Sequence, residues 1–176
     1  MRLIDLPTTP MNSAYNPVAW SPFFSAEAGA LAALLGLIFV AVSINLARII
    51  KRDNLVSRSA EALFILLGPL LASTFCLAPG QSNHFLGWEL TASGLFIWIA
   101  ATRSQFRSTR RNPYVSKRTK VFHFLLTQSA VVPFVVGGIS MLAGRGGGLY
   151  WLLAGTVFSF LASLFDAWVL LIEILR

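Results

Sequence analysis

Two acids, Asp166 and Glu173, lie in a long apolar stretch near the C-terminus and are the residues best suited to chemistry. An acid near the centre of a membrane-spanning helix costs about 2.5–3.5 kcal/mol, so it is expected to pair with another group or to serve a pathway. Helical spacing places both acids on one face with three hydroxyl residues, Thr156, Ser159 and Ser163. Because lipid cannot satisfy polar groups, we expect this face to point at other helices.

A second group of polar residues is predicted at the same end of the bundle. Asn45 and Arg48 lie near the end of the first apolar stretch, and Glu61 begins the second. Arg48 is placed to meet Glu61, Asp166 or Glu173 from a neighbouring helix. With Ser159 and Ser163, these residues are interpreted either as an ion, proton or substrate pathway, or as a polar clasp that fixes helix register.

A smaller acidic set, Glu27 and Glu89 with His84 nearby, is predicted at the opposite end. Acids close to helix ends, such as Glu27, Glu61 and Glu173, also have a simpler interpretation as charges that reach the membrane interface. The two histidines, His84 and His123, fall on opposite sides of the predicted membrane. They therefore cannot share one haem or metal, and no metal-binding, nucleophile or phosphate-loop motif accompanies them. We predict no cofactor, no metal and no enzyme activity.

Composition explains why lipid is the expected solvent. Of the 176 residues, 56% are apolar and only 12% are charged, about half the charged share of soluble domains. The length suits one domain. The net charge of +7 is concentrated between long apolar runs, which is typical of membrane topology and argues against nucleic acid as a partner.

The sequence predicts an all-α integral membrane bundle of about five helices. An interfacial tail over 1–25, containing several aromatic residues, is expected to precede them. Gly68-Pro69 and Pro133 are expected to kink two of the helices. The predicted spans cover residues 26–47, 60–77, 86–102, 121–143 and 149–175.

Basic residues predict the orientation. Lys and Arg are concentrated in the first and third connections between spans, whereas the second connection has none. The positive-inside rule then places the N-terminus outside and the C-terminus in the cytoplasm. The third connection also predicts contact with anionic lipid headgroups, through Arg107, Arg110, Arg111, Lys117, Arg118 and Lys120. On the first span, Gly29, Ala33 and Gly36 predict close approach by another helix, more often within the chain than between copies.

Three segments resemble a known group of proteins: LLGLIFVAVSINLARI (34–49), SAEALFILLGPLLASTFCLAPGQ (59–81) and AWVLLIEIL (167–175). Together they are similar to small bacterial polytopic membrane proteins of unassigned function, some of which are labelled as modulators of a membrane-bound AAA protease. The resemblance implies a multi-pass protein of the bacterial inner membrane. It supplies no catalytic residues.

Three classes of function follow from these patterns. The first is a small, homo-oligomeric ion channel or transport protein with a polar pathway on the last helix. The second is a regulatory or scaffold subunit of a membrane complex, without a pore. The third is a lipid-modifying membrane enzyme that uses Asp166 or Glu173, although isolated carboxylates alone favour it.

Overall fold

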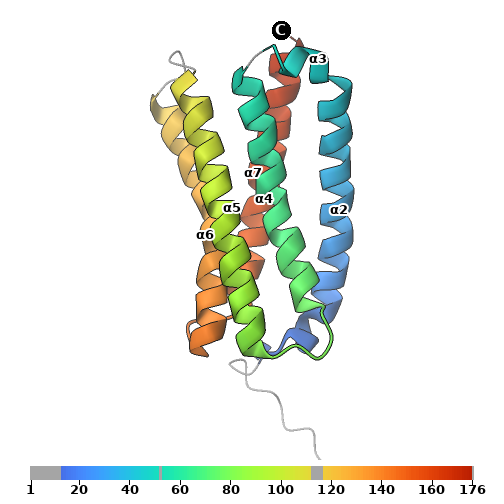
Figure 1. The fold of residues 1–176 in the computed structure, drawn as a ribbon, viewed down its shortest axis with the longest axis vertical. Helices are drawn as coiled ribbons and strands as arrows, with labels where there is room; N and C mark the ends of the chain where they lie inside the picture. The colour runs from blue at the N-terminus through green and yellow to red at the C-terminus, as the bar shows by residue number, and fades with distance from the viewer. Residues whose placement is uncertain (1–12, 52, 112–116, 176) are drawn as a thin grey trace, which may run out of the picture.

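The computed structural model describes residues 13–51, 53–111 and 117–175, and the side chains at 53–54, 108–111 and 169–175 lie outside the description. Every regular element in the described residues is helical (Figure 1). In chain order these are η1 (Pro17–Trp20), α2 (Ser21–Ile44), α3 (Leu46–Ile49), α4 (Asp53–Cys76), α5 (Asn83–Arg111), α6 (Lys117–Ala143) and α7 (Tyr150–Leu175).

Five helices are long and apolar enough to cross a membrane, as the sequence predicted. The candidate spans are Pro17–Ile44, Leu55–Cys76, Asn83–Arg107, Lys117–Ala143 and Tyr150–Trp168. Several helices extend beyond the predicted spans. The first helix begins at Ser21 rather than 26, so the predicted tail over 1–25 is partly helical. α5 continues to Arg111 because its polar last turns still follow helical geometry beyond the apolar stretch.

Local sequence explains where the first helices begin and end. The Asn16 side chain accepts a hydrogen bond from the Val18 backbone N–H and caps η1. At the other end of α2, Asn45 interrupts the helix, and its Nδ2 donates to the Ala41 carbonyl over 2.9 Å. Asn competes for backbone groups in this way, which makes it a helix breaker. α4 and α6 continue through Pro69 and Pro133 without interruption.

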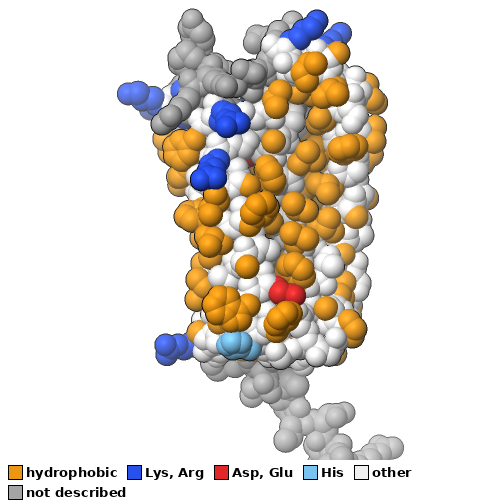
Figure 2. All heavy atoms as spheres, in the orientation of Figure 1, with side chains coloured by type: hydrophobic (Ala, Val, Ile, Leu, Met, Phe, Trp, Pro, Cys, Tyr) orange, Lys and Arg blue, Asp and Glu red, His pale blue; other side chains and the backbone are white. Residues whose placement is uncertain are grey.

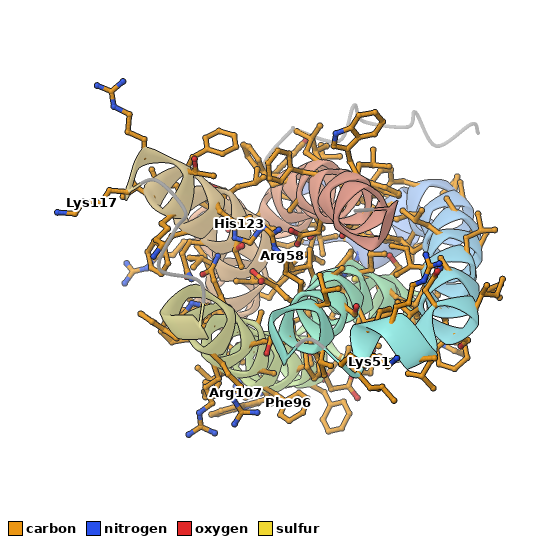
Figure 3. The ribbon with its side chains drawn as sticks, turned by 90° about the horizontal axis from the view of Figure 1, so that it is seen from above. Lys51, Arg58, Phe96, Arg107, Lys117 and His123 are labelled. Carbon is orange, nitrogen blue, oxygen red and sulfur yellow. The ribbon has the colours of Figure 1, made fainter. Side chains whose placement is uncertain are left out.

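α7 lies between α4 and α6, and α5 covers the other side of the same pair. α2 packs mainly against α4 and stands at the edge of the bundle (Figures 1 and 3). The connections from α2 to α4 and from α5 to α6 lie at one end, which we call the basic end. The connections from α4 to α5 and from α6 to α7 lie at the opposite end, beside η1.

The outer surface is largely apolar, as a lipid-facing surface requires. Figure 2 shows apolar side chains over the middle of one face, with most of the visible Lys and Arg side chains near the basic end. Exposed large residues occur on every long helix, including Phe39, Trp88, Phe96, Phe122 and Leu161. These observations together indicate a multi-pass membrane protein.

The half of the bundle at the opposite end has an apolar core and very close helix contacts. Phe24, Leu90, Phe134 and Leu152 belong to its buried core. At Gly138 on α6, an added Cβ would lie 2.6 Å from the Thr91 backbone nitrogen on α5. The two backbones therefore meet there only because the residue has no side chain.

The chain before η1 is tied to the turn between α6 and α7. The Leu149 N–H donates to the Ala14 carbonyl over 2.8 Å, and the Gly147 N–H donates to the Tyr15 hydroxyl over 3.1 Å. Gly148 has a φ of 50°, in the left-handed region, and an added Cβ there would collide with the Ala14 carbonyl. This link closes the opposite end of the bundle.

Candidate functional site: a buried polar cluster

Five polar residues meet inside the half of the bundle nearer the basic end; we call them the polar cluster. Four helices contribute: Glu61 from α4, Gln105 from α5, His123 and Thr127 from α6, and Asp166 from α7. Glu61 lies about 12 Å along the axis of α4 from its first residue, and His123 lies about 9 Å along the axis of α6 from its first residue. Glu61 is fully buried and Asp166 is 1% exposed. His123 is slightly more accessible, at 12% of its side chain.

His123 joins the two acids. Its Nε2 lies 2.7 Å from Asp166 Oδ1, and its Nδ1 lies 3.8 Å from Glu61 Oε1. The Gln105 amide nitrogen lies 3.0 Å from Nδ1 and 3.1 Å from the His123 carbonyl oxygen. Because a carbonyl oxygen only accepts, this end of the amide must be the donor, and Nδ1 of the neutral ring accepts from it. The ring proton is thus assigned to Nε2, which donates to Asp166.

Thr127 connects the remaining members of the polar cluster. Its hydroxyl lies 2.9 Å from Glu61 Oε1 and 3.0 Å from the His123 carbonyl oxygen, and its single proton serves one of these acceptors at a time. The same hydroxyl accepts from Gln105 over 2.8 Å. The two carboxyl groups are thereby held on either side of one imidazole by side chains from α5 and α6.

The polar cluster retains unused acceptors. Glu61 Oε2, Asp166 Oδ2 and Gln105 Oε1 are buried and make no hydrogen bond. Nearby, the half-buried Arg58 of α4 interacts electrostatically with both Glu61 and His123, and Figure 3 shows Arg58 and His123 close together near the bundle interior. One guanidinium balances only one of two carboxylates. Burying such oxygen atoms without a hydrogen bond costs free energy, and a proton or a cation that reaches them removes this cost.

Buried hydroxyl residues continue from Asp166 along α7 toward the opposite end. We call Thr156, Ser159 and Ser163 the hydroxyl stripe; Ser159 and Ser163 are fully buried and Thr156 is 5% exposed. From Thr156 to Asp166 the residues cover about 15 Å along the helix axis. This face of α7 therefore points at other helices, and Ser159 Oγ donates to the Ala130 carbonyl of α6.

A third buried acid, Glu27 of α2, lies at the far end of the hydroxyl stripe. Its side chain is 6% exposed, and Ser73 of α4 and Thr156 of α7 face its carboxyl group. Neither carboxyl oxygen makes a hydrogen bond of normal geometry. Burial excludes the interpretation of Glu27 and Glu61 as exposed interfacial charges. The third acid considered in that way, Glu173, lies in α7, but its side chain is outside the described residues.

Two other predicted pathway residues, Asn45 and Arg48, are not members of the polar cluster. Asn45 caps the break after α2, and Arg48 is exposed at the basic end. The side chains that hydrogen-bond to Asp166 and Glu61 come from α6 instead, because α2 stands at the edge of the bundle. Glu89 is half-buried and hydrogen-bonded to Gln81.

The headgroup-contact residues lie at the basic end. Arg107, Lys117 and Arg118 are exposed, and Lys120 is half-buried. The side chains of Arg110 and Arg111 lie outside the described residues. Gly29, Ala33 and Gly36 are exposed, and nothing approaches within 4 Å of a Cβ built at either glycine. The expectation that these small residues pack within the chain was therefore wrong.

Sequence reasoning missed His123, Gln105 and Thr127 as members of the site. It compared His123 only with His84, and the structure does place these histidines on helices whose starts lie at opposite ends. The useful signal was local: His123 and Thr127 are four residues apart on one face of α6. The pairing of that face with acids from α4 and α7 has no trace in the sequence. A group of one histidine and two carboxylates also offers metal ligands that the motif search did not consider.

No match was found to any family model, curated protein or solved structure. The function must therefore be argued from the site itself.

Proposed function

We propose that the protein is a proton-conducting transport protein whose pathway runs through the bundle interior. The carrying observation is the row of three ionisable side chains from three helices: His123 is hydrogen-bonded to the buried Asp166 on one side and lies 3.8 Å from the buried Glu61 on the other. Buried chains of Asp, Glu and His are the usual material of proton relays in membrane proteins.

The geometry supports a proton relay through the imidazole. The ring carries a proton on Nε2 toward Asp166, while Nδ1 faces Glu61 at 3.8 Å. When Glu61 gives a proton to Nδ1, the Nε2 proton passes to Asp166, so the ring gains one proton and loses another. Gln105 must release Nδ1 for this step, and a ring flip or a return transfer resets the cycle. Glu61 needs to move by about 1 Å to reach hydrogen-bond distance.

The hydroxyl stripe extends this relay toward the opposite end. Ser163, Ser159 and Thr156 lead from Asp166 to Glu27, and each is buried. Hydroxyl groups both donate and accept, so they can pass protons together with internal waters. Beyond Glu27, a cavity of about 520 Å³ at the opposite end is lined by residues that include Ser21, Cys76 and Gln81. Cys76 lies one turn after Ser73 on α4, which brings this cavity near Glu27.

The orientation and location belong to the same proposal. The basic connections support placing the basic end, and with it the end of α7, in the cytoplasm, with η1 on the outside. The exposed Arg107, Lys117 and Arg118 then contact anionic headgroups. The resemblance to small bacterial polytopic proteins supports the bacterial inner membrane. The exposed glycines of α2 leave a face on which a second copy can pack.

Proton flux in liposomes tests the proposal. The purified chain, reconstituted with a pH-sensitive dye inside the vesicles, is expected to admit protons under an imposed voltage. Asp166→Asn is expected to lower this flux at least tenfold, because an amide cannot take the relayed proton. Glu89→Gln is the matched control, since Glu89 is half-buried and outside the stripe. Absence of flux in the native chain, or equal flux in both variants, refutes the proposal.

One observation favours a second function, that of a non-catalytic subunit. The polar cluster joins α4, α5, α6 and α7 with hydrogen bonds, as a clasp that fixes helix register would. The exposed apolar residues of α2 then provide a surface for another membrane protein. Copurification from native membranes distinguishes the two: a stoichiometric partner together with no flux supports the subunit function.

A further inference from the structure

We propose that Glu61, His123 and Asp166 form a binding site for one divalent transition-metal ion, Zn²⁺ or Mn²⁺. One ligand atom from each residue lies within 4.8 Å of the others. The residues come from α4, α6 and α7, so the bundle fold brings the ligands together. This inference does not depend on proton conduction.

The ligand types define the class of ion. Imidazole nitrogen suits Zn²⁺ and other first-row transition metals, and carboxylate oxygen suits Zn²⁺ and Mn²⁺. Ca²⁺ and Mg²⁺ prefer all-oxygen sites with more ligands or several bound waters. One histidine and two acids supply three ligand atoms, which leaves the fourth position of a tetrahedral ion for water.

Burial and charge give a second argument for a cation. Glu61 and Asp166 are at least 99% buried, and one oxygen of each carboxyl group makes no hydrogen bond. Each of these free oxygens belongs to a carboxyl group whose other oxygen faces His123 or Thr127. Arg58 acts on Glu61 from α4 and balances one carboxylate at most. A dication bound by both acids matches their combined charge of −2 directly.

Metal binding requires defined changes, the largest at Glu61, whose ligand atom lies within 4.8 Å of the other two and has to close in by up to about 1.4 Å. The His123 Nε2 proton, now shared with Asp166 Oδ1 over 2.7 Å, is released so that the nitrogen lone pair binds the ion. Two ligands on one tetrahedral ion lie roughly 3.4 Å apart, so Nε2 and Oδ1 separate by less than about 1 Å. Thr127 continues to donate to Glu61 and holds that ligand in place, as residues outside a metal's ligand set usually do.

Metal titration of the full-length chain in detergent tests the inference. After treatment with chelator, the protein is dialysed against Zn²⁺ or Mn²⁺, and bound metal is counted by elemental analysis. One ion per chain and an increased melting temperature are expected. His123→Asn and Glu61→Gln are each expected to weaken binding at least tenfold. His84→Asn, which changes an exposed histidine at the opposite end, is the control and should bind as the native chain does.

Cobalt absorption provides a readout that does not depend on stability. Co²⁺ bound to the native chain should give the visible absorption bands of a site with nitrogen and oxygen ligands. His123→Asn should shift or abolish these bands, although the variant still elutes as a folded protein in size-exclusion chromatography. Less than one ion per chain, or binding unchanged in His123→Asn, overturns the inference. Metal binding without proton flux retains this site and refutes the proposed function, and flux without metal binding does the reverse.

Discussion

The two halves of the bundle are held together by different means. In the half at the opposite end, α5 and α6 approach so closely that Gly138 lies against the Thr91 backbone, around an apolar core. In the half nearer the basic end, the helices meet through the polar cluster, and some of its acceptor atoms have no partner. Close packing of α5 against α6 thus gives one half a tight frame, with Glu27 as its buried acid. The other half brings two acids and a histidine together, and their protonation or ligands can change.

The largest expected effect on stability comes from breaking the close contact. Gly138→Ala places a Cβ 2.6 Å from a backbone nitrogen, which a side-chain rotation cannot relieve. We expect the free energy of unfolding to fall by about 2–3 kcal/mol, as for overpacked cores. Denaturant titration in mixed micelles measures this. A loss of less than about 0.5 kcal/mol would show that the two backbones separate easily, and would remove the contrast between the halves.

A smaller loss is expected in the polar cluster. Thr127→Val keeps the side-chain volume but removes the hydroxyl from Glu61 Oε1 and Gln105. The free energy of unfolding should fall by about 1–2 kcal/mol, because buried partners are left unsatisfied. Thr74→Val is the matched control, since Thr74 is exposed and its hydroxyl bonds only to the Leu70 carbonyl of its own helix. An equal loss in both variants would show that the polar cluster adds no stability.

The smallest expected effect has the opposite sign and lies on α2 at the edge of the bundle. At Gly36 on α2, nothing lies within 4 Å of an added Cβ. Gly36→Ala should therefore raise the free energy of unfolding, by up to about 1 kcal/mol through helix propensity. The same titration detects it. A marked destabilisation would instead reveal a neighbour at this face, and the oligomeric state of the variant, measured by light scattering, would identify it as a second copy.

Sequence patterns predicted the fold well because a bilayer restricts the choice. Hydropathy alone located all of the spans, and helical spacing placed Ser159, Ser163 and Asp166 on one face. The ends of the helices were less predictable: α2 and α5 extend into polar residues that hydropathy does not recognise. The candidate site was predicted only in part. Asp166 and Glu61 were identified from their types, but their common partner His123 depends on how α6 rotates against α4 and α7.

The same limitation explains the error about α2. The small residues Gly29, Ala33 and Gly36 were expected to face the chain's own helices. This expectation assumed a central position for this helix. Instead α2 packs mainly against α4 at the edge of the bundle. Which helices are neighbours is decided by tertiary packing, which the periodicity of a single helix does not contain.

The link between Ala14 and Leu149 has a consequence for the order of assembly. The carbonyl of residue 14 is synthesised long before the N–H of residue 149 that it accepts from. During synthesis, this hydrogen bond can therefore form only after both α6 and the glycine turn have emerged. Contacts between such distant parts of a chain form late. The contact between Ala14 and Leu149 therefore reports that insertion is complete. A crosslink between these two positions would identify the chains that have reached that stage.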